Sequence, residues 1–341
     1  MTVSATIDQP GVRLIDMQAP PERNAMAAVR RWIYLHGEAL ATELMVPYMR
    51  RLLDTDREKL LRWAVGARKR YHLVSRPNLS LAQAEAMTIR GPHGALPAPP
   101  TPSEWFAPIR GEPRGFVLYV HGGSFMAERS PRVTALIGRF AAAANARVFA
   151  PSYRLAPENP CPAAVEDIEA AFAWLGRTWP DEPVVAVAES AGAAILLAAL
   201  QRMRDRGEAL PRGAMFLSPW LDLSLQSRSV ALSSFVSRTR LTMDALALTA
   251  RLYLHDMSAT DPVASPLFGD MHGLPPMLIH ASKSDTLYDD AVRLADKVRD
   301  AGGDLTARLW TSETHVWERS SAPAARQSIE LGAEFIRDRL A

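Results

Sequence analysis

The sequence contains a single cysteine, Cys161, among 341 residues. One cysteine excludes an intrachain disulfide and a zinc site built from several cysteines, and it fits a reducing compartment. An excess of charge is also missing, because 39 basic and 37 acidic residues leave a formal net charge of +2. This balance gives no sign of binding to nucleic acid or to an anionic membrane, so we expect a small-molecule partner.

Long uncharged apolar segments and targeting signals are missing as well. No stretch is long enough to cross a bilayer, and residues 1–10 lack a basic segment followed by an apolar core. The histidines have no metal-binding spacing such as His-x-x-x-His, and no Gly-rich phosphate loop is evident. We therefore expect a cytoplasmic protein without a metal, a cofactor or a membrane span.

The pattern of apolar and turn residues along the chain changes near residue 82. The first part has helical features, including a capping-box pattern that begins at Thr55. We predict a helical cap segment over residues 1–82 and a larger domain over residues 83–341. A further helical pattern at Thr242–His255 interrupts the larger domain and predicts a cap insertion at about residues 223–262.

Short apolar strands separated by Gly and Pro begin at about Ala86, with a turn at Leu96–Pro102 between the first two. Six further strands are expected at Phe116–Val120, Arg147–Pro151, Pro183–Ala188, Gly213–Ser218, Met277–Ala281 and Leu305–Trp310. Apolar stripes within Leu287–Val298 and Ile329–Leu340 predict two of the helices between or after them. Such alternation is typical of a parallel sheet covered on both faces. We predict an α/β fold with a mostly parallel eight-stranded sheet.

The apolar run Val184–Leu200 is broken once, at Glu189-Ser190. Its β-branched first half favours a buried strand, and its Ala/Leu-rich second half favours a helix. A serine in such a turn, followed by Gly192, is typical of the nucleophile elbow of α/β hydrolases. The usual pattern is Gly-x-Ser-x-Gly, and Ala188 occupies the place of the first glycine. A serine that only caps the helix is the alternative.

A glycine pair follows the first strongly apolar strand, in His121-Gly122-Gly123-Ser124-Phe125. Glycines let the backbone approach a substrate, and backbone N–H groups can stabilise an oxyanion. We predict an oxyanion hole formed by the N–H groups of Gly122, Gly123 and Ala191. An ordinary glycine turn at the end of a strand is the alternative.

A serine nucleophile needs a base within hydrogen-bond reach, itself oriented by a carboxylate. In α/β hydrolases the acid and then the histidine follow the serine along the chain. Asp285 follows the strand Met277–Ala281, and His315 follows the strand Leu305–Trp310. Helix capping by Asp285 and a surface position for His315 are the alternatives.

Four other acidic residues deserve comparison with Asp285. Asp222 follows a strand and is an alternative acid, whereas we expect Asp289 and Asp290 to be structural because a helix would turn them away from the sheet edge. Glu189 lies beside the predicted nucleophile. It could tune the base, but we favour a role as partner of a buried neighbour.

With these motifs in place, the chain resembles the bacterial hormone-sensitive-lipase-like carboxylesterases of the α/β-hydrolase fold-3 family over roughly residues 86–340. The resemblance also rests on five further segments: Ser152–Glu158, Pro162–Asp167, Ser218–Leu223, Ala264–Phe268 and Asp285–Asp290. Three positions depart from the family pattern, with Ser124, Ala188 and Ala193 where glycines are common.

The resemblance implies a serine hydrolase that cleaves esters of short to medium acyl chains through an acyl-enzyme. Ser190 would be the nucleophile, His315 the base and Asp285 the acid that orients it. The same residues could serve a lactone, carbamate or amide hydrolase or an acyltransferase, and a ligand-binding relative without catalysis is a further alternative. The family also suggests a possible homodimer through the last sheet edge, around Leu305–Trp310.

Overall fold

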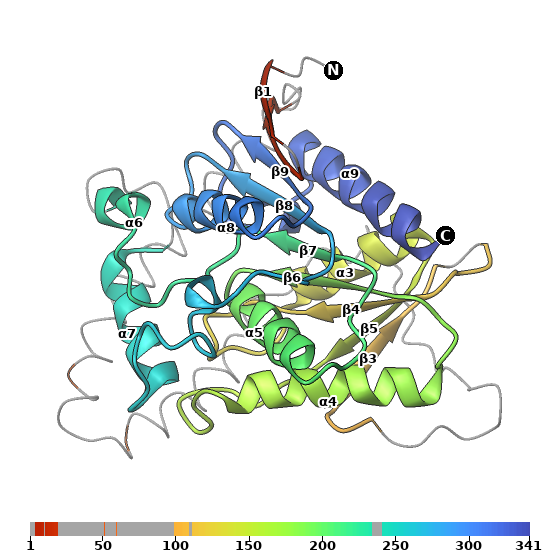
Figure 1. Cartoon of the computed structure of the whole chain (residues 1–341), viewed down its shortest axis with the longest axis horizontal. Coiled ribbons are helices and arrows are strands. Elements are labelled where there is room, and N and C mark those ends of the chain that lie inside the picture. Colours follow the sequence, from red (N-terminus) through yellow and green to blue (C-terminus); the bar gives the residue numbers. More distant parts are fainter. Residues whose placement is uncertain are drawn as a thin grey trace.

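A nine-stranded sheet forms the centre of the described structure (Figure 1). The computed structural model describes residues 4–9, 11–19, 51, 59, 99–108, 111–233 and 241–341. The strands are β1 (Ser4–Gln9), β2 (Val12–Met17), β3 (Ser103–Phe106), β4 (Phe116–Val120), β5 (Arg147–Pro151), β6 (Val184–Glu189), β7 (Ala214–Leu217), β8 (Met277–Ser282) and β9 (Leu305–Trp310). Their order across the sheet is β1-β2-β9-β8-β7-β6-β4-β5-β3. All neighbours are parallel except the two outermost pairs, β1 with β2 and β3 with β5.

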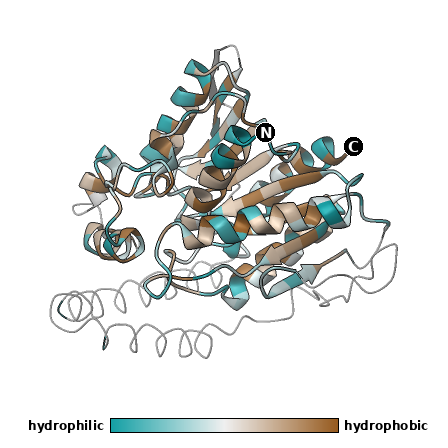
Figure 2. Cartoon of the chain, turned by 60° about the horizontal axis from the view of Figure 1, so that its bottom comes forward, coloured by the Kyte–Doolittle hydropathy of each residue, from teal (hydrophilic) through white to brown (hydrophobic). Residues whose placement is uncertain are grey.

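Helices cover both faces of this sheet. The main ones are α3 (Pro131–Ala144), α4 (Ala163–Thr178), α5 (Ala191–Asp205), α8 (Tyr288–Asp300) and α9 (Pro323–Leu340). Strand residues alternate between the faces. Phe116 and Leu118 of β4 pack in the apolar cluster that contains α4, α5 and α8, whereas Val117 and Tyr119 pack with α3 and α9. Figure 2 shows the hydrophobic colouring concentrated on the central strands and on the helix faces turned toward them.

The predicted fold class, a mostly parallel α/β sheet, is confirmed. Each of the six strands expected from Phe116 onward lies within one residue of its predicted ends. The described sheet has nine strands where eight were predicted. The N-terminal residues contribute β1 and β2, and β3 is the one strand that the structure describes between residues 86 and 115, where two were expected.

The prediction of helix for the whole N-terminal segment is wrong for residues 4–9 and 12–17. These residues form a hairpin, and β2 pairs in parallel with all of β9, from Val12 beside Leu305 to Met17 beside Trp310. The backbone of β2 therefore finds its hydrogen bonds on a distant strand, which no local pattern reveals. Gly11, at a φ of 82°, lies in the hairpin connection. Between residues 20 and 82 of the predicted cap segment, the structure describes only Arg51 and Lys59, and both are helical.

The position of β9 also corrects the expected dimer edge. β9 lies between β8 and β2, so its two sides are already paired. A second copy of the chain cannot add to the sheet at Leu305–Trp310 unless β2 leaves.

The predicted insertion contains two described helices, α6 (Arg228–Ser233) and α7 (Met243–Leu254). The pattern at Thr242–His255 is confirmed as a helix. Thr242 is its N-cap, where its side chain accepts a hydrogen bond from Ala245 N, and His255 is its C-cap. Across the residues that the structure describes, no helix is long and apolar enough to span a membrane.

Two phenylalanines offer a matched test of the core. Phe216 on β7 is fully buried, whereas Phe268 is 36% exposed. We expect Phe216→Ala to lower the free energy of unfolding by about 3–5 kcal/mol, since it leaves a cavity at the centre of the sheet. Phe268→Ala should cost about 1 kcal/mol or less. Urea unfolding measures both, and equal losses would contradict this account of the core.

Candidate active site

Ser190 occupies the turn between β6 and α5 in an unusual backbone conformation, with φ 52° and ψ −126°. Such a conformation is rare for a residue other than glycine and persists only where the surroundings impose it. The Ser190 N–H donates to the carbonyl of Leu217 at 3.0 Å. At Gly192, a Cβ atom would lie 2.5 Å from the carbonyl oxygens of Val120 and His121. The turn thus needs a glycine there.

The Ser190 side chain makes no capping hydrogen bond to α5. Its Oγ lies instead 2.8 Å from Nε2 of His315. The alternative of a serine that only caps the helix therefore does not hold. Ala188 and Ala193, which replace glycines of the family pattern, are both fully buried.

His315 also contacts Asp285, with Nδ1 2.8 Å from the carboxylate Oδ2. The other oxygen, Oδ1, accepts a hydrogen bond from Leu287 N at 3.2 Å, so Asp285 orders the start of its own helix as well. Asp285 is buried, and the His315 side chain is 11% exposed. Ser190, His315 and Asp285 thus form one hydrogen-bonded line from residues that lie far apart in the sequence.

The loop that carries His315 is held by two buried serines that the sequence analysis did not single out. Ser218, at the end of β7, accepts a hydrogen bond from Val316 N at 3.1 Å. Ser282, at the end of β8, donates to the carbonyl of Glu313 at 2.7 Å. Their positions at strand ends are a signal, but serine is too common there to be recognised from sequence alone.

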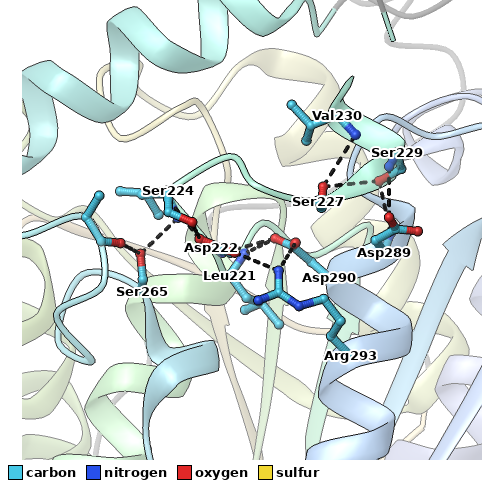
Figure 3. Close-up of polar contacts among 12 residues, drawn as sticks. Leu221, Asp222, Ser224, Ser227, Ser229, Val230, Ser265, Asp289, Asp290 and Arg293 are labelled. Atoms are coloured by element: carbon cyan, nitrogen blue, oxygen red, sulfur yellow. Dashed lines mark hydrogen bonds and ion pairs between the residues drawn. The ribbon is translucent and has the colours of Figure 1, made fainter. Parts of the chain in front are cut away.

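The other acidic residues have structural partners (Figure 3). Asp222 accepts a hydrogen bond from Arg293 at 2.6 Å, so its carboxylate is engaged away from His315. Asp290 accepts from the N–H groups of Leu221 and Asp222 at 2.7 and 3.0 Å. Asp289 accepts from Ser229 N at 2.8 Å. The structural interpretation of Asp289 and Asp290 is confirmed, and Asp285 is the acid that contacts His315.

The three predicted oxyanion donors differ in their surroundings. Ala191 is the first residue of α5, so its N–H has no acceptor within the helix. Gly123 has a φ of 129°, which only glycine adopts readily, and a Cβ atom there would lie 2.6 Å from the carbonyl oxygen of Ala127. The N–H of Gly122, by contrast, donates to the Glu189 carboxylate at 3.1 Å.

Buried groups hold the glycine loop from behind. The His121 ring stacks on Tyr153 at 4.4 Å between centroids, and its Nδ1 lies 2.6 Å from the Gly122 carbonyl oxygen. Burial lowers the pKa of His121 to about 3, so this ring is neutral at working pH. The Tyr153 hydroxyl donates to the His121 carbonyl at 2.8 Å. Tyr153 lies in the Ser152–Glu158 segment of the resemblance, but its partner could not be read from the sequence.

Glu189 is fully buried and pairs with Arg319, which follows His315 by four residues. Arg319 Nε and Nη2 contact the two carboxylate oxygens at 3.0 and 2.9 Å. The prediction that Glu189 partners a buried neighbour is therefore confirmed. Nothing in the sequence pointed to Arg319.

A serine, an imidazole and a carboxylate in one hydrogen-bonded line, beside backbone N–H groups at a helix N-terminus, are suited to acyl transfer. No group of three or more His, Cys, Asp or Glu side chains that could hold a metal ion occurs among the described residues. The fold is that of the α/β hydrolases, and the site has the groups that this class uses.

Comparisons with known proteins agree with this class. Residues 117–319 match the family described as alpha/beta hydrolase fold, and the chain belongs to that family. The acetyl-hydrolase of Streptomyces hygroscopicus is 37% identical over 244 residues, which cover 69% of this chain and 79% of that protein. Esterase LipU of Mycobacterium tuberculosis is 30% identical over 77% of this chain and 86% of its own length.

Solved structures give the same result. An esterase from the bacterial hormone-sensitive lipase family matches with a TM-score of 0.72 and 30% identity, over 88% of this chain and 98% of that one. EstE5, in a crystal soaked with p-nitrophenyl butyrate, matches with a TM-score of 0.71 and 30% identity, over 81% and 91% of the two chains. The protein is an esterase of the bacterial hormone-sensitive lipase family, a carboxylic ester hydrolase.

Asp290 predicts a pH dependence of stability. Burial, the largest cause, raises the pKa of Asp290 from 3.8 to about 7, against the lowering effect of its backbone donors. Between these pH values the folded state holds a proton that the unfolded state has lost, so this carboxyl makes the free energy of unfolding fall as pH rises. Asn at this position cannot titrate.

We expect the stability of the wild type relative to Asp290→Asn to decline from about pH 4 to about pH 7 and then to level off. Urea unfolding at a series of pH values measures the difference. Asp296→Asn, at a side chain 49% exposed, is the control for loss of one charge on the same helix. Parallel pH profiles for wild type and Asp290→Asn would contradict the raised pKa.

Proposed function

We propose that this chain hydrolyses carboxylic esters of short to medium acyl chains through an acyl-enzyme on Ser190. The observation that carries the proposal is the hydrogen-bonded line from Ser190 Oγ through His315 to Asp285, with both contacts at 2.8 Å. His315 accepts the hydroxyl proton through Nε2 as Oγ attacks the ester carbonyl. Asp285 holds Nδ1–H and stabilises the imidazolium that forms.

The negative charge on the carbonyl oxygen needs donors in place before the reaction. The N–H groups of Gly123 and Ala191 are the donors we favour, because Gly122 donates to Glu189. His315 then gives the proton to the leaving alcohol. Water, deprotonated by the same imidazole, attacks the acyl-enzyme, and release of the acid restores Ser190.

The preference for shorter acyl chains is supported by three buried aromatic rings next to the glycine loop. Phe125 stacks on Tyr253 of α7 at 3.9 Å between centroids and lies 5.3 Å from the ring of Trp220. We infer that these rings limit the length of the acyl pocket beside the glycine loop. We expect the specificity constant to fall from p-nitrophenyl butyrate to the dodecanoate.

We also propose that residues 223–262 act as a cap, with the catalytic domain at 83–341 and a further cap segment at 1–82. Support comes from contacts between this insertion and the loop after Asp285. Ser229 donates to the Thr286 carbonyl at 2.7 Å, and the Thr286 hydroxyl donates to the Leu241 carbonyl at 3.1 Å.

Two variants test the assignment of the nucleophile and the acid. Ser190→Ala should lower kcat for p-nitrophenyl butyrate by about 10⁴-fold or more, and Asp285→Asn by about 10⁴-fold, because each removes one member of a cooperating set. Ser258→Ala, at an exposed serine, is the control and should keep full activity. Undiminished turnover by Ser190→Ala would show that Ser190 is not the nucleophile.

The alternatives require separate measurements. A panel of lactone, carbamate and amide substrates, with product analysis in the presence of an alcohol, separates hydrolysis from acyl transfer. A fluorophosphonate should label Ser190 in the wild type. Failure of labelling would favour a ligand-binding protein that has lost catalysis.

A further inference from the structure

One buried carboxylate joins the three segments that build the site. Glu189 ends β6, next to Ser190, and no part of it is exposed. It accepts from Gly122 N in the glycine loop at 3.1 Å, and from both Nε and Nη2 of Arg319 in the segment that follows His315. The nucleophile, the oxyanion loop and the histidine loop therefore share one set of contacts.

The atoms around Gly122, next to the reacting serine, are closely packed. A Cβ atom at Gly122 would lie 2.9 Å from the Glu189 carbonyl oxygen, 3.0 Å from Ser190 Cβ and 3.1 Å from Arg319 Nη2. A residue with a side chain at position 122 would therefore displace Glu189, Ser190 or Arg319, and only glycine lets these groups lie so close together. The Gly122 N–H lies in the peptide plane that ends at Gly122 Cα, so the carboxylate holds the atom from which the next plane begins. That next plane carries the N–H of Gly123 and is held through the Gly122 carbonyl oxygen, 2.6 Å from His121 Nδ1.

The charges of Glu189 and Arg319 also affect the reaction, because both groups lie close to Ser190. A lone carboxylate beside Ser190 would repel the oxyanion that forms there, with little screening at a buried site. The guanidinium of Arg319, bound to both oxygens, offsets that charge. Its side chain is only 20% exposed, so solvent screens this pair weakly.

We propose that Glu189 and Arg319 are positioning residues of the reaction: Glu189 orients the glycine loop through Gly122, and Arg319 neutralises Glu189 and ties it to the histidine loop. This inference rests on the proposed function of Ser190. It assigns to Gly122 the task of directing its neighbour, while Gly123 and Ala191 face the oxyanion. Neither Glu189 nor Arg319 touches the substrate in this scheme.

The first test is Glu189→Gln, which keeps the shape and removes the charge. Its single amide oxygen can replace Oε1, which contacts Gly122 N and Arg319 Nη2, or Oε2, which accepts from Arg319 Nε, but not both. The amide NH2 then faces a donor and the ion pair is lost, so the guanidinium and the loop should lose their fixed orientation. We expect kcat per active site to fall about 10- to 100-fold, with KM changed by less than about threefold. Active sites are counted by the burst of p-nitrophenol that a p-nitrophenyl phosphonate releases as it phosphonylates the serine, so a smaller folded fraction does not enter the value.

A second readout reports on the oxyanion itself. A trifluoromethyl ketone forms an adduct with the serine that carries an oxyanion, so its inhibition constant should rise by about the same factor as kcat falls. Arg319→Gln, which leaves Glu189 charged and unpaired, should lose more than Glu189→Gln. The double variant should recover part of that loss, because it removes both charges together.

Glu169→Gln is the matched control. Glu169 on α4 also binds arginines, with contacts from Arg202 at 2.6 and 3.4 Å and from Arg206 at 3.2 Å, but at the end of α5 that lies away from Ser190. Its kcat and ketone affinity should equal those of the wild type. If Glu189→Gln kept kcat per site within about twofold, or kept its ketone affinity whatever happened to kcat, the proposal would be overturned.

Two further variants complete the test of the positioning role. If Glu189→Gln does not fold, Arg319→Lys takes its place, because it keeps the charge and loses the two-pronged contact; the same two outcomes apply. Ser190→Ala separates this inference from the proposed function. Activity that survives in Ser190→Ala would refute the proposed function. If Ser190→Ala is inactive and Glu189→Gln is unimpaired, only the positioning role is refuted.

Discussion

The backbone of Ser190 imposes the constraint on which the rest of the site depends. A residue with a side chain at φ 52° and ψ −126° must be held by its neighbours. The hydrogen bond to Leu217 on β7 does so from one side, and the close approach of Gly192 to the carbonyls of Val120 and His121 does so from the other. The strands β4 and β7, which lie on either side of β6, thus hold the turn that carries the hydroxyl.

The parallel order of the sheet explains why distant residues meet. The carboxyl ends of parallel strands lie along one edge, so residues that follow different strands become neighbours there. Ser190 follows β6, Asp285 follows β8 and His315 follows β9. Ser218 and Ser282, at the ends of β7 and β8, then fix the loop that carries the histidine.

Most of the sheet and the three reacting residues could be predicted because their signals are local. Each apolar strand of the core is bounded by turn residues, and Ser190, Asp285 and His315 each follow one. Two kinds of feature could not be predicted. β2 gains its hydrogen bonds from β9, and the pairing of Glu189 with Arg319 joins residues 130 positions apart. Neither contact produces a periodic pattern in the sequence. The hydrogen bond from the Gly122 N–H to Glu189 depends on the pairing of Glu189 with Arg319, so it could not be predicted either.

The pairing of β2 with β9 also has a consequence for synthesis of the chain. Val12 lies beside Leu305, so β2 has no parallel partner until the residues up to Leu305 have been made. At roughly 5–20 residues per second, that interval lasts on the order of tens of seconds. The edge of β2 that does not face β1 is a site for association with other chains during this time. The parallel pairing at this edge therefore forms long after β2 has been made, and the yield of folded protein depends on what protects β2 until then.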